Sequence, residues 1–139
     1  VMTEQTNTAV VQQFYEAMGR GDIPALLGLV ADDVEWTFQG PDRLPFAGAY
    51  RGHEGVSDFL GAVDSTIEFE RFAPREFVAQ GDTVVVVGDE RSRIPPTDRV
   101  VEQAWAHVYR FRDGRIAAFE AFEDTAALVA AIDPDSAPM

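Results

Sequence analysis

The sequence predicts an α+β fold in which three helices from the first half of the chain pack on a strongly curved, mainly antiparallel sheet. Apolar residues recur at helical spacing up to residue 63, and apolar and polar residues alternate along most of 66–123. Helices first and strands afterwards is an order typical of this class. With 139 residues, 46% of them hydrophobic, the chain suits one domain over 1–139. We expect a core over about 8–132 and a flexible tail over 133–139.

Two helices are expected before the first strand. An apolar stripe over residues 10–18 follows polar residues 6–8, which we expect to cap the first helix, and Gly19 ends it. Asp22 is a suitable N-cap for a second helix over 23–30, with Pro24 in its first turn.

One strand and one helix follow. Residues 34–39 alternate apolar and polar, as a half-buried strand does. A loop rich in Pro and Gly then runs to about Gly52, and apolar residues at helical spacing predict a third helix over 53–63.

The second half of the chain predicts consecutive antiparallel hairpins, because strand-like segments alternate with turn residues. The first of these strands should bend near Pro74. A short C-terminal helix over 126–132 follows, with Asp124 or Thr125 as its cap. The expected strands cover residues 67–79, 83–94, 99–112 and 116–123.

Side-chain alternation divides the strand over 99–112 into two faces. If Ile94 pairs with Arg99, Glu90 of the preceding strand shares the inner face, and Gly88 lies opposite Trp105. The missing side chain at Gly88 leaves room either for the indole or for a ligand. The large inner face comprises Val101, Gln103, Trp105, His107, Tyr109 and Phe111.

The last hairpin has two possible registers. A two-residue turn at Asp113-Gly114 brings Glu120 inward, whereas a three-residue loop that includes Arg112 pairs Phe111 with Arg115 and brings Glu123 inward. We favour the second register, which also turns Ala117, Phe119 and Ala121 inward.

Three residues are candidates for catalysis: His107, Glu90 and, in the favoured register, Glu123. A single histidine on an aromatic face is more often a core residue than a catalyst. An inward Glu90 is stronger evidence, because a buried carboxylate needs a partner, a raised pKa or a wet cavity. The aromatic residues expected to bind substrate around them are Phe14, Tyr15, Trp36, Phe38, Tyr50, Phe59, Trp105, Tyr109 and Phe119.

Charge and composition narrow the partners. A net charge of −13, with arginine as the only basic residue other than histidine, argues against nucleic acid and against membranes, and favours an apolar small-molecule ligand. Cysteine is absent and the two histidines are far apart, so we expect no metal site, and no motif indicates a cofactor. The chain opens on polar residues, from which we expect no secretory signal and a cytoplasmic location.

The outer face of the sheet predicts a homodimer. Val100, Ala104, Ala106 and Val108 form an apolar strip on the side away from the helices.

In its order of motifs the chain resembles the SnoaL-like and ketosteroid-isomerase-like branch of the nuclear-transport-factor-two-like superfamily. The resemblance covers about 8–132. It implies a conical α+β barrel with a deep apolar pocket, frequently dimeric, on which cyclases, isomerases, dehydratases, epoxide hydrolases and non-enzymatic binders are built. The matching segments are the first helix, Gly21-Asp22, residues 31–36, Tyr50-Arg51-Gly52, residues 81–84 and residues 107–116.

Carried over residue by residue, the resemblance argues against a steroid isomerase. Such enzymes place an oxyanion-hole tyrosine where this chain has Phe14, a general-base aspartate at Phe38 and a protonated acid at His107. SnoaL-like cyclases carry an acid/base residue, usually Asp, near the His107 position, and histidine can transfer that proton.

We therefore expect a small cofactor-free SnoaL-like enzyme of cyclase, isomerase or lyase type, acting on an apolar carbonyl-bearing molecule. His107 would exchange the proton, and Glu90 or Glu123 would orient its imidazole. The rival hypothesis is a non-catalytic domain for ligand binding or dimerisation. An epoxide hydrolase is a minor alternative, because Asp89 and Arg91 have suitable spacing but should face away from the pocket.

Overall fold

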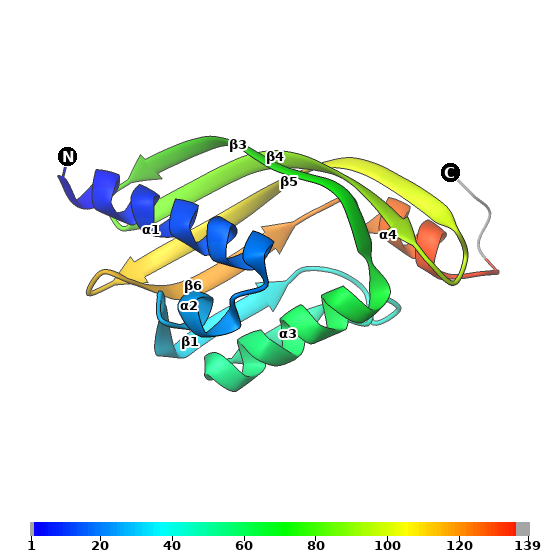
Figure 1. Cartoon of the computed structure of the whole chain (residues 1–139), viewed down its shortest axis with the longest axis horizontal. Helices are drawn as coiled ribbons and strands as arrows, with labels where there is room; N and C mark the ends of the chain where they lie inside the picture. The colour runs from blue at the N-terminus through cyan, green and yellow to red at the C-terminus, as the bar shows by residue number, and fades with distance from the viewer. Residues whose placement is uncertain (1, 136–139) are drawn as a thin grey trace.

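A computed structural model describes residues 2–135. Three helices lie on the inner face of one curved sheet, and a fourth lies beyond its end (Figure 1). The strands follow the order β2-β1-β6-β5-β4-β3, so that β2 and β3 are the two edges of an open, mainly antiparallel sheet. The elements are α1 (Met2–Arg20), α2 (Ile23–Leu27), β1 (Val30–Phe38), β2 (Gly48–Arg51), α3 (Gly52–Thr66), β3 (Glu68–Gln80), β4 (Thr83–Ile94), β5 (Arg99–Arg112), β6 (Arg115–Phe122) and α4 (Thr125–Ile132).

The first two helices differ from the prediction at their ends. Residues 6–8 do not cap α1, which begins at Met2, because Thr8 donates its hydroxyl to the carbonyl of Glu4 inside the helix. Asp22 caps α2 as predicted, accepting from the backbone N–H of Ala25 at 3.2 Å. This helix ends at Leu27 rather than at residue 30, because Val30 already belongs to β1.

The loop expected before Gly52 contains a strand that the sequence did not reveal. β2 pairs antiparallel with β1, and Trp36 lies opposite Tyr50. β1 also pairs in parallel with β6, placing Trp36 beside Phe119. The prediction of consecutive hairpins missed both pairings, and that of β1 with β6 joins segments far apart in the chain.

The inner face of β4 and β5 is as predicted. Ile94 pairs with Arg99 and Gly88 with Trp105, and inward side chains alternate with outward ones along both strands. A Cβ atom at Gly88 would lie 2.5 Å from Cζ2 of Trp105, so the missing side chain makes room for the indole. The bend expected near Pro74 is a bulge between Pro74 and Glu76.

The last hairpin begins in the first, less favoured register, with Arg112 paired with Arg115. Its turn has two residues, Asp113 and Gly114, whose φ values of 53° and 77° are both positive, as a type I′ turn requires. The predicted three-residue loop is therefore wrong. A bulge at Ala117 nevertheless reverses the parity of β6, so that Phe119 and Ala121 face inward as predicted, and Ile116 takes the buried position expected for Ala117.

The C-terminal tail is partly described. Arg99 donates to the carbonyl oxygens of Asp133 and Pro134 at 3.0 and 3.4 Å. The rest of the predicted flexible tail, residues 136–139, lies outside the described residues. No helix within residues 2–135 is long and apolar enough to cross a membrane.

Candidate functional site

A cavity of about 720 Å³ lies between α1, α3 and the inner face of the sheet. The side chains that wall it are mostly apolar, with ten Phe, Tyr or Trp rings among them. Glu90 on β4, His107 on β5 and Glu123 directly after β6 are polar, and α3 adds Ser57 and Asp64. Of the residues predicted for the site, Phe14, Tyr15, Trp36, Phe38, Phe59, His107, Tyr109, Phe119, Glu90 and Glu123 line the cavity.

Two predicted lining residues do not reach the cavity. The Trp105 ring stacks on that of His107, with ring centres 4.0 Å apart, and fills the space above Gly88. The Tyr50 hydroxyl donates to the carbonyl of Phe46 at 3.0 Å, and its ring packs edge-on against Phe59. Both support the wall from behind rather than forming it.

Glu90 is the more deeply buried of the two acidic side chains. It lies on β4 with 2% of its surface exposed, and the Ser92 hydroxyl donates a hydrogen bond to its Oε2. Burial raises the pKa of Glu90 to about 7, and the nearby Glu123 carboxyl adds to the increase. Glu90 therefore changes its charge near neutral pH.

Glu123 follows β6 directly and faces the same cavity. Nε2 of Gln103 donates to its Oε1 at 2.9 Å, and its Oε2 lies 3.4 Å from Nε2 of His107. Burial raises the pKa of Glu123 to about 7, although the Gln103 hydrogen bond opposes that increase. The site thus contains two carboxyl groups that titrate in the same range.

His107 lies between Glu123 and α1. Its Nδ1 is hydrogen-bonded to the Tyr15 hydroxyl at 2.8 Å, so a helix and a strand meet at this ring. Burial lowers the pKa of His107 to about 3, which leaves the imidazole neutral at neutral pH. Burial also raises the pKa of Tyr15, which stays a neutral phenol. The groups poised to exchange protons are therefore the glutamates rather than the histidine.

The cavity contains no counter-ion for these carboxyls. No arginine is among its described lining residues, and Asp64 of α3 adds a further acidic group to the wall. Within residues 2–135, no group of three or more His, Cys, Asp or Glu side chains is arranged to hold a metal ion. An anionic ligand would therefore be repelled by the polar end of the cavity.

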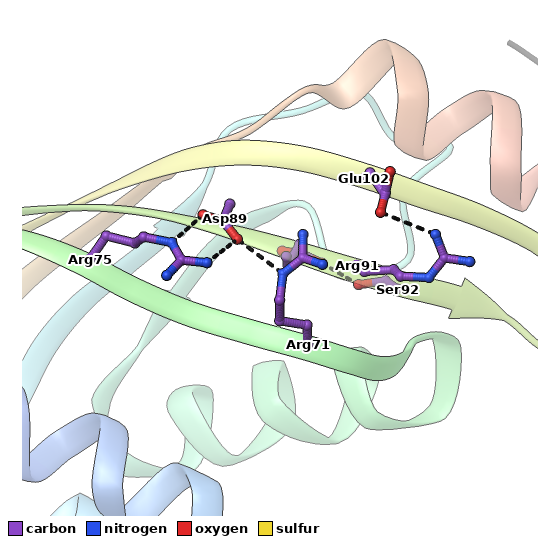
Figure 2. Close-up of polar contacts among 7 residues, drawn as sticks. Arg71, Arg75, Asp89, Arg91, Ser92 and Glu102 are labelled. Atoms are coloured by element: carbon purple, nitrogen blue, oxygen red, sulfur yellow. Dashed lines mark hydrogen bonds and ion pairs between the residues drawn. The ribbon is translucent and has the colours of Figure 1, made fainter.

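Asp89 and Arg91 face away from the cavity, as predicted. Asp89 accepts hydrogen bonds from Arg71 and Arg75, and Arg91 donates to Glu102, all on the outer face of the sheet (Figure 2). These two residues consequently supply no Asp-Arg pair to the cavity for an epoxide hydrolase.

Gln103 and Phe72 were not among the residues predicted for the site. Alternation placed Gln103 on the inner face with His107, but its contact with Glu123 depends on β6 and could not be read from that alternation. Phe72 lines the cavity from β3 and stacks on Trp105 at 4.9 Å. The bulges in β3 obscure its alternation, so its direction could not be read from the sequence.

Comparison with known proteins agrees with this architecture. Residues 11–119 match the SnoaL-like domain family. An NTF2-like protein from Burkholderia xenovorans is 36% identical, with 96% of this chain and 100% of that chain covered and a TM-score of 0.88. TerC, co-crystallized with polyporic acid, is 29% identical, with coverages of 92% and 98% and a TM-score of 0.81. The uncharacterized protein Rv0034 of Mycobacterium tuberculosis is 28% identical over 121 residues, which are 87% of this chain and 91% of that protein.

Proposed function

The chain belongs to the SnoaL-like domain family, and from that premise we propose that it is a cofactor-free enzyme that moves a proton on an apolar, carbonyl-bearing small molecule. The observation that carries the proposal is the pair of buried carboxyls, Glu90 and Glu123, on the wall of an aromatic cavity without a cation. An acid/base catalyst works best when its pKa lies near the working pH, and both of these pKa values are about 7.

In the proposed reaction an ionised glutamate takes a proton from the carbon next to the substrate carbonyl. The other glutamate, still protonated, donates a hydrogen bond to the oxygen on which negative charge develops. Two neighbouring carboxyls share this work readily, because ionisation of one disfavours ionisation of the other. Proton return from the glutamate to a different atom would complete an isomerisation. In a cyclisation the carbanion would attack a second carbonyl of the same substrate, and the alkoxide formed would take the proton from a glutamate.

The neighbouring groups support this chemistry without titrating themselves. His107 would hold Oε2 of Glu123 in place, and the Tyr15 phenol would fix the imidazole. Phe14 and Phe38 offer no proton donor or acceptor, so the tyrosine and aspartate of a steroid isomerase have no equivalent there. Co-crystallization of TerC with polyporic acid supports a small-molecule ligand for this chain too.

Hydrogen exchange tests the proposal without knowledge of the product. A panel of apolar ketones is incubated with the protein in D₂O, and deuterium uptake at the carbon next to the carbonyl is followed by NMR. We expect uptake to accelerate as the pH rises through about 7, and Glu123→Gln to slow it by about 10²–10⁴-fold. The matched control is Glu120→Gln, a half-buried glutamate of β6 that does not line the cavity, which should leave the rate unchanged.

The rival, a domain that only binds a ligand, makes the opposite prediction. The decisive case is a ketone that binds in the cavity. If its hydrogen exchange were no faster with the parent than with the double variant Glu90→Gln/Glu123→Gln, the result would contradict the catalytic proposal and support that rival.

We also propose a homodimer formed through the outer face of the sheet. Val87, Ala106 and Phe122 form one row across β4, β5 and β6, and Val87 and Phe122 are 40% and 45% exposed. Val100, at 42% exposure, extends the apolar surface along β5. Light scattering should give twice the 15.3 kDa chain mass, and Ala106→Arg should give the single chain. A 15.3 kDa parent species at micromolar concentration would contradict the dimer.

A further inference from the structure

Gln103 links the candidate site to the start of α4 through both ends of its side-chain amide. The backbone N–H of Asp124 donates to Oε1 of Gln103 at 2.7 Å, and Nε2 of Gln103 donates to Oε1 of Glu123 at 2.9 Å. The side chain is buried, with 8% of its surface exposed. A buried amide bonded at both ends has one defined orientation.

The backbone group decides that orientation. A backbone N–H can only donate, so the amide oxygen of Gln103 must face Asp124, and its NH₂ group must face Glu123. Oε1 of Glu123 is therefore held as an acceptor whether or not the carboxyl is protonated. A proton bound to this carboxyl therefore favours Oε2, because the unprotonated carbonyl oxygen of a carboxylic acid is the better acceptor for the Gln103 amide.

We propose that Gln103 is a positioning residue that confines the exchangeable proton of Glu123 to Oε2, the oxygen beside His107. This inference rests on the proposed function, for which it names the atom of Glu123 that exchanges the proton. Gln103 is the one side chain within residues 2–135 that is fixed as a hydrogen-bond donor to this carboxyl, because the role of His107 depends on its tautomer.

Confinement of the proton to Oε2 ties the protonation of Glu123 to the tautomer of His107. When Glu123 is ionised, Nε2–H of the neutral imidazole donates to Oε2, and Tyr15 donates its hydroxyl to Nδ1. When Glu123 is protonated, Oε2–H donates to Nε2, and the imidazole proton moves to Nδ1 and points at the Tyr15 oxygen. The imidazole and the phenol keep one proton each throughout, so only Glu123 gains or loses charge.

The other groups facing Glu123 do not replace Gln103. Glu90 on β4 is acidic, Tyr15 on α1 and His107 on β5 are neutral at neutral pH, and the adjacent Asp124 offers its carboxylate to the N–H of Ala127. None of them is a cation that could stabilise the ionised carboxylate. Removal of the Gln103 amide should therefore raise the pKa of Glu123.

The first test uses the parent protein, labelled with ¹⁵N in histidine and ¹³C in glutamate side chains. NMR across pH 5–9 follows the Glu123 carboxyl carbon and both His107 ring nitrogens. We expect His107 to carry its proton on Nδ1 below the Glu123 titration and on Nε2 above it, without forming imidazolium. The same tautomer on both sides of the Glu123 titration would overturn the proposal.

The second test replaces the amide. In Gln103→Leu we expect the pKa of Glu123 to rise by about one to two pH units, the equivalent of one lost hydrogen bond to a charged group. The pH profile of hydrogen exchange should move by the same amount. The matched control is Gln39→Leu, which removes an amide-to-carboxylate hydrogen bond of 3.2 Å to Glu120 in the exposed part of the structure and should leave Glu123 unchanged.

A second variant tests whether the shift arises only because the start of α4 has lost its hydrogen bond to Gln103. Gln103→Glu keeps an oxygen for the N–H of Asp124 but removes the donor to Glu123, so it should also raise the pKa of Glu123. A shift no larger than that of Gln39→Leu in either folded variant would overturn the proposal. Failure of the proposed function is a different result: Glu123→Gln would keep full hydrogen exchange while the Glu123 titration still responded to Gln103.

Discussion

The two faces of β4 shift the pKa values of neighbouring acidic residues in opposite directions. Asp89 faces outward, where Nε of Arg75 lies 2.5 Å from Oδ2 and Nε of Arg71 lies 3.1 Å from Oδ1, and the Arg75 hydrogen bond lowers its pKa (Figure 2). Glu90, the next residue, faces inward, where Ser92 is its hydrogen-bonding neighbour and burial raises its pKa to about 7. Two adjacent residues of one strand thus differ: Asp89 stays ionised at neutral pH, whereas Glu90 gains or loses its charge there.

Burial of Glu90 and arginine placement around Asp89 cause this difference. All eleven arginines lie within the described residues, and none of them is buried. Those of β3 and β4 form ion pairs along the outer face, whereas the cavity wall contains acidic side chains and no arginine. Strand alternation alone therefore produces a stable charged surface on one side and a proton-exchanging surface on the other.

The largest effect expected from this comparison is a pH-dependent gain of stability in Glu123→Gln. The folded pKa of Glu123 is about 7 against an ordinary 4.5, so the unfolded chain ionises first and the parent loses stability as pH rises through this window. The loss amounts to about 3 kcal/mol above pH 7, and a glutamine does not incur it.

Urea unfolding at pH 4.5 and pH 8 measures this gain. The difference between Glu123→Gln and the parent should be about 3 kcal/mol more favourable at pH 8 than at pH 4.5. Burial of His107 acts with the opposite sign, since its pKa is lowered, but it is present in both proteins and cancels. Glu120→Gln, at a half-buried position outside the cavity, should show no such gain. Equal differences between Glu123→Gln and the parent at both pH values would contradict the burial argument.

A smaller effect is expected from Gly88→Ala, which tests the packing behind the inner face. The new methyl group would lie 2.5 Å from the carbonyl oxygen of Ala73 and 2.5 Å from Cζ2 of Trp105. The ring must move, and the free energy of unfolding should fall by about 1–3 kcal/mol. Thermal unfolding checks this result, with Gly61→Ala as the control because a Cβ at Gly61 meets nothing within 4 Å. Undiminished stability of Gly88→Ala would show that the indole is loosely held.

Much of the inner face could be predicted from the sequence, because alternation along β4 and β5 and one short connection determine it. Glu90, Gln103, Trp105 and His107 all face inward as the pairing of Ile94 with Arg99 requires. The inward direction of Phe119 was also predicted, but for the wrong reason: the turn is one residue shorter than expected, and a bulge at Ala117 compensates. The sequence does not reveal a bulge of this kind, because no particular residue type marks it.

The rest of the site depends on contacts between distant segments. Tyr15 and His107 are 92 residues apart, and only the packing of α1 on the sheet brings them within 2.8 Å. The sequence predicts that His107 exchanges the proton, whereas burial lowers its pKa to about 3 and leaves the imidazole neutral. Burial of this extent cannot be read from one strand, because α1 and β6 supply the groups that enclose the ring.

The smallest effect is expected from Asp89→Asn on the outer face, and its sign should be opposite to that of Glu123→Gln. Asp89 has a lowered pKa, so its contribution to stability is present above the ordinary value of 3.8 and is lost as pH falls below it. Asparagine keeps the size of the side chain and loses the charge, while water and salt already screen the exposed arginines. Urea unfolding at pH 7 should therefore show a slight loss of stability in low salt that disappears in 1 M NaCl. If Asp89→Asn instead changed stability as much as the interior substitution, or gained stability with rising pH, the outer carboxylate would be behaving as a buried one, and the contrast between the two faces of β4 would have to be abandoned.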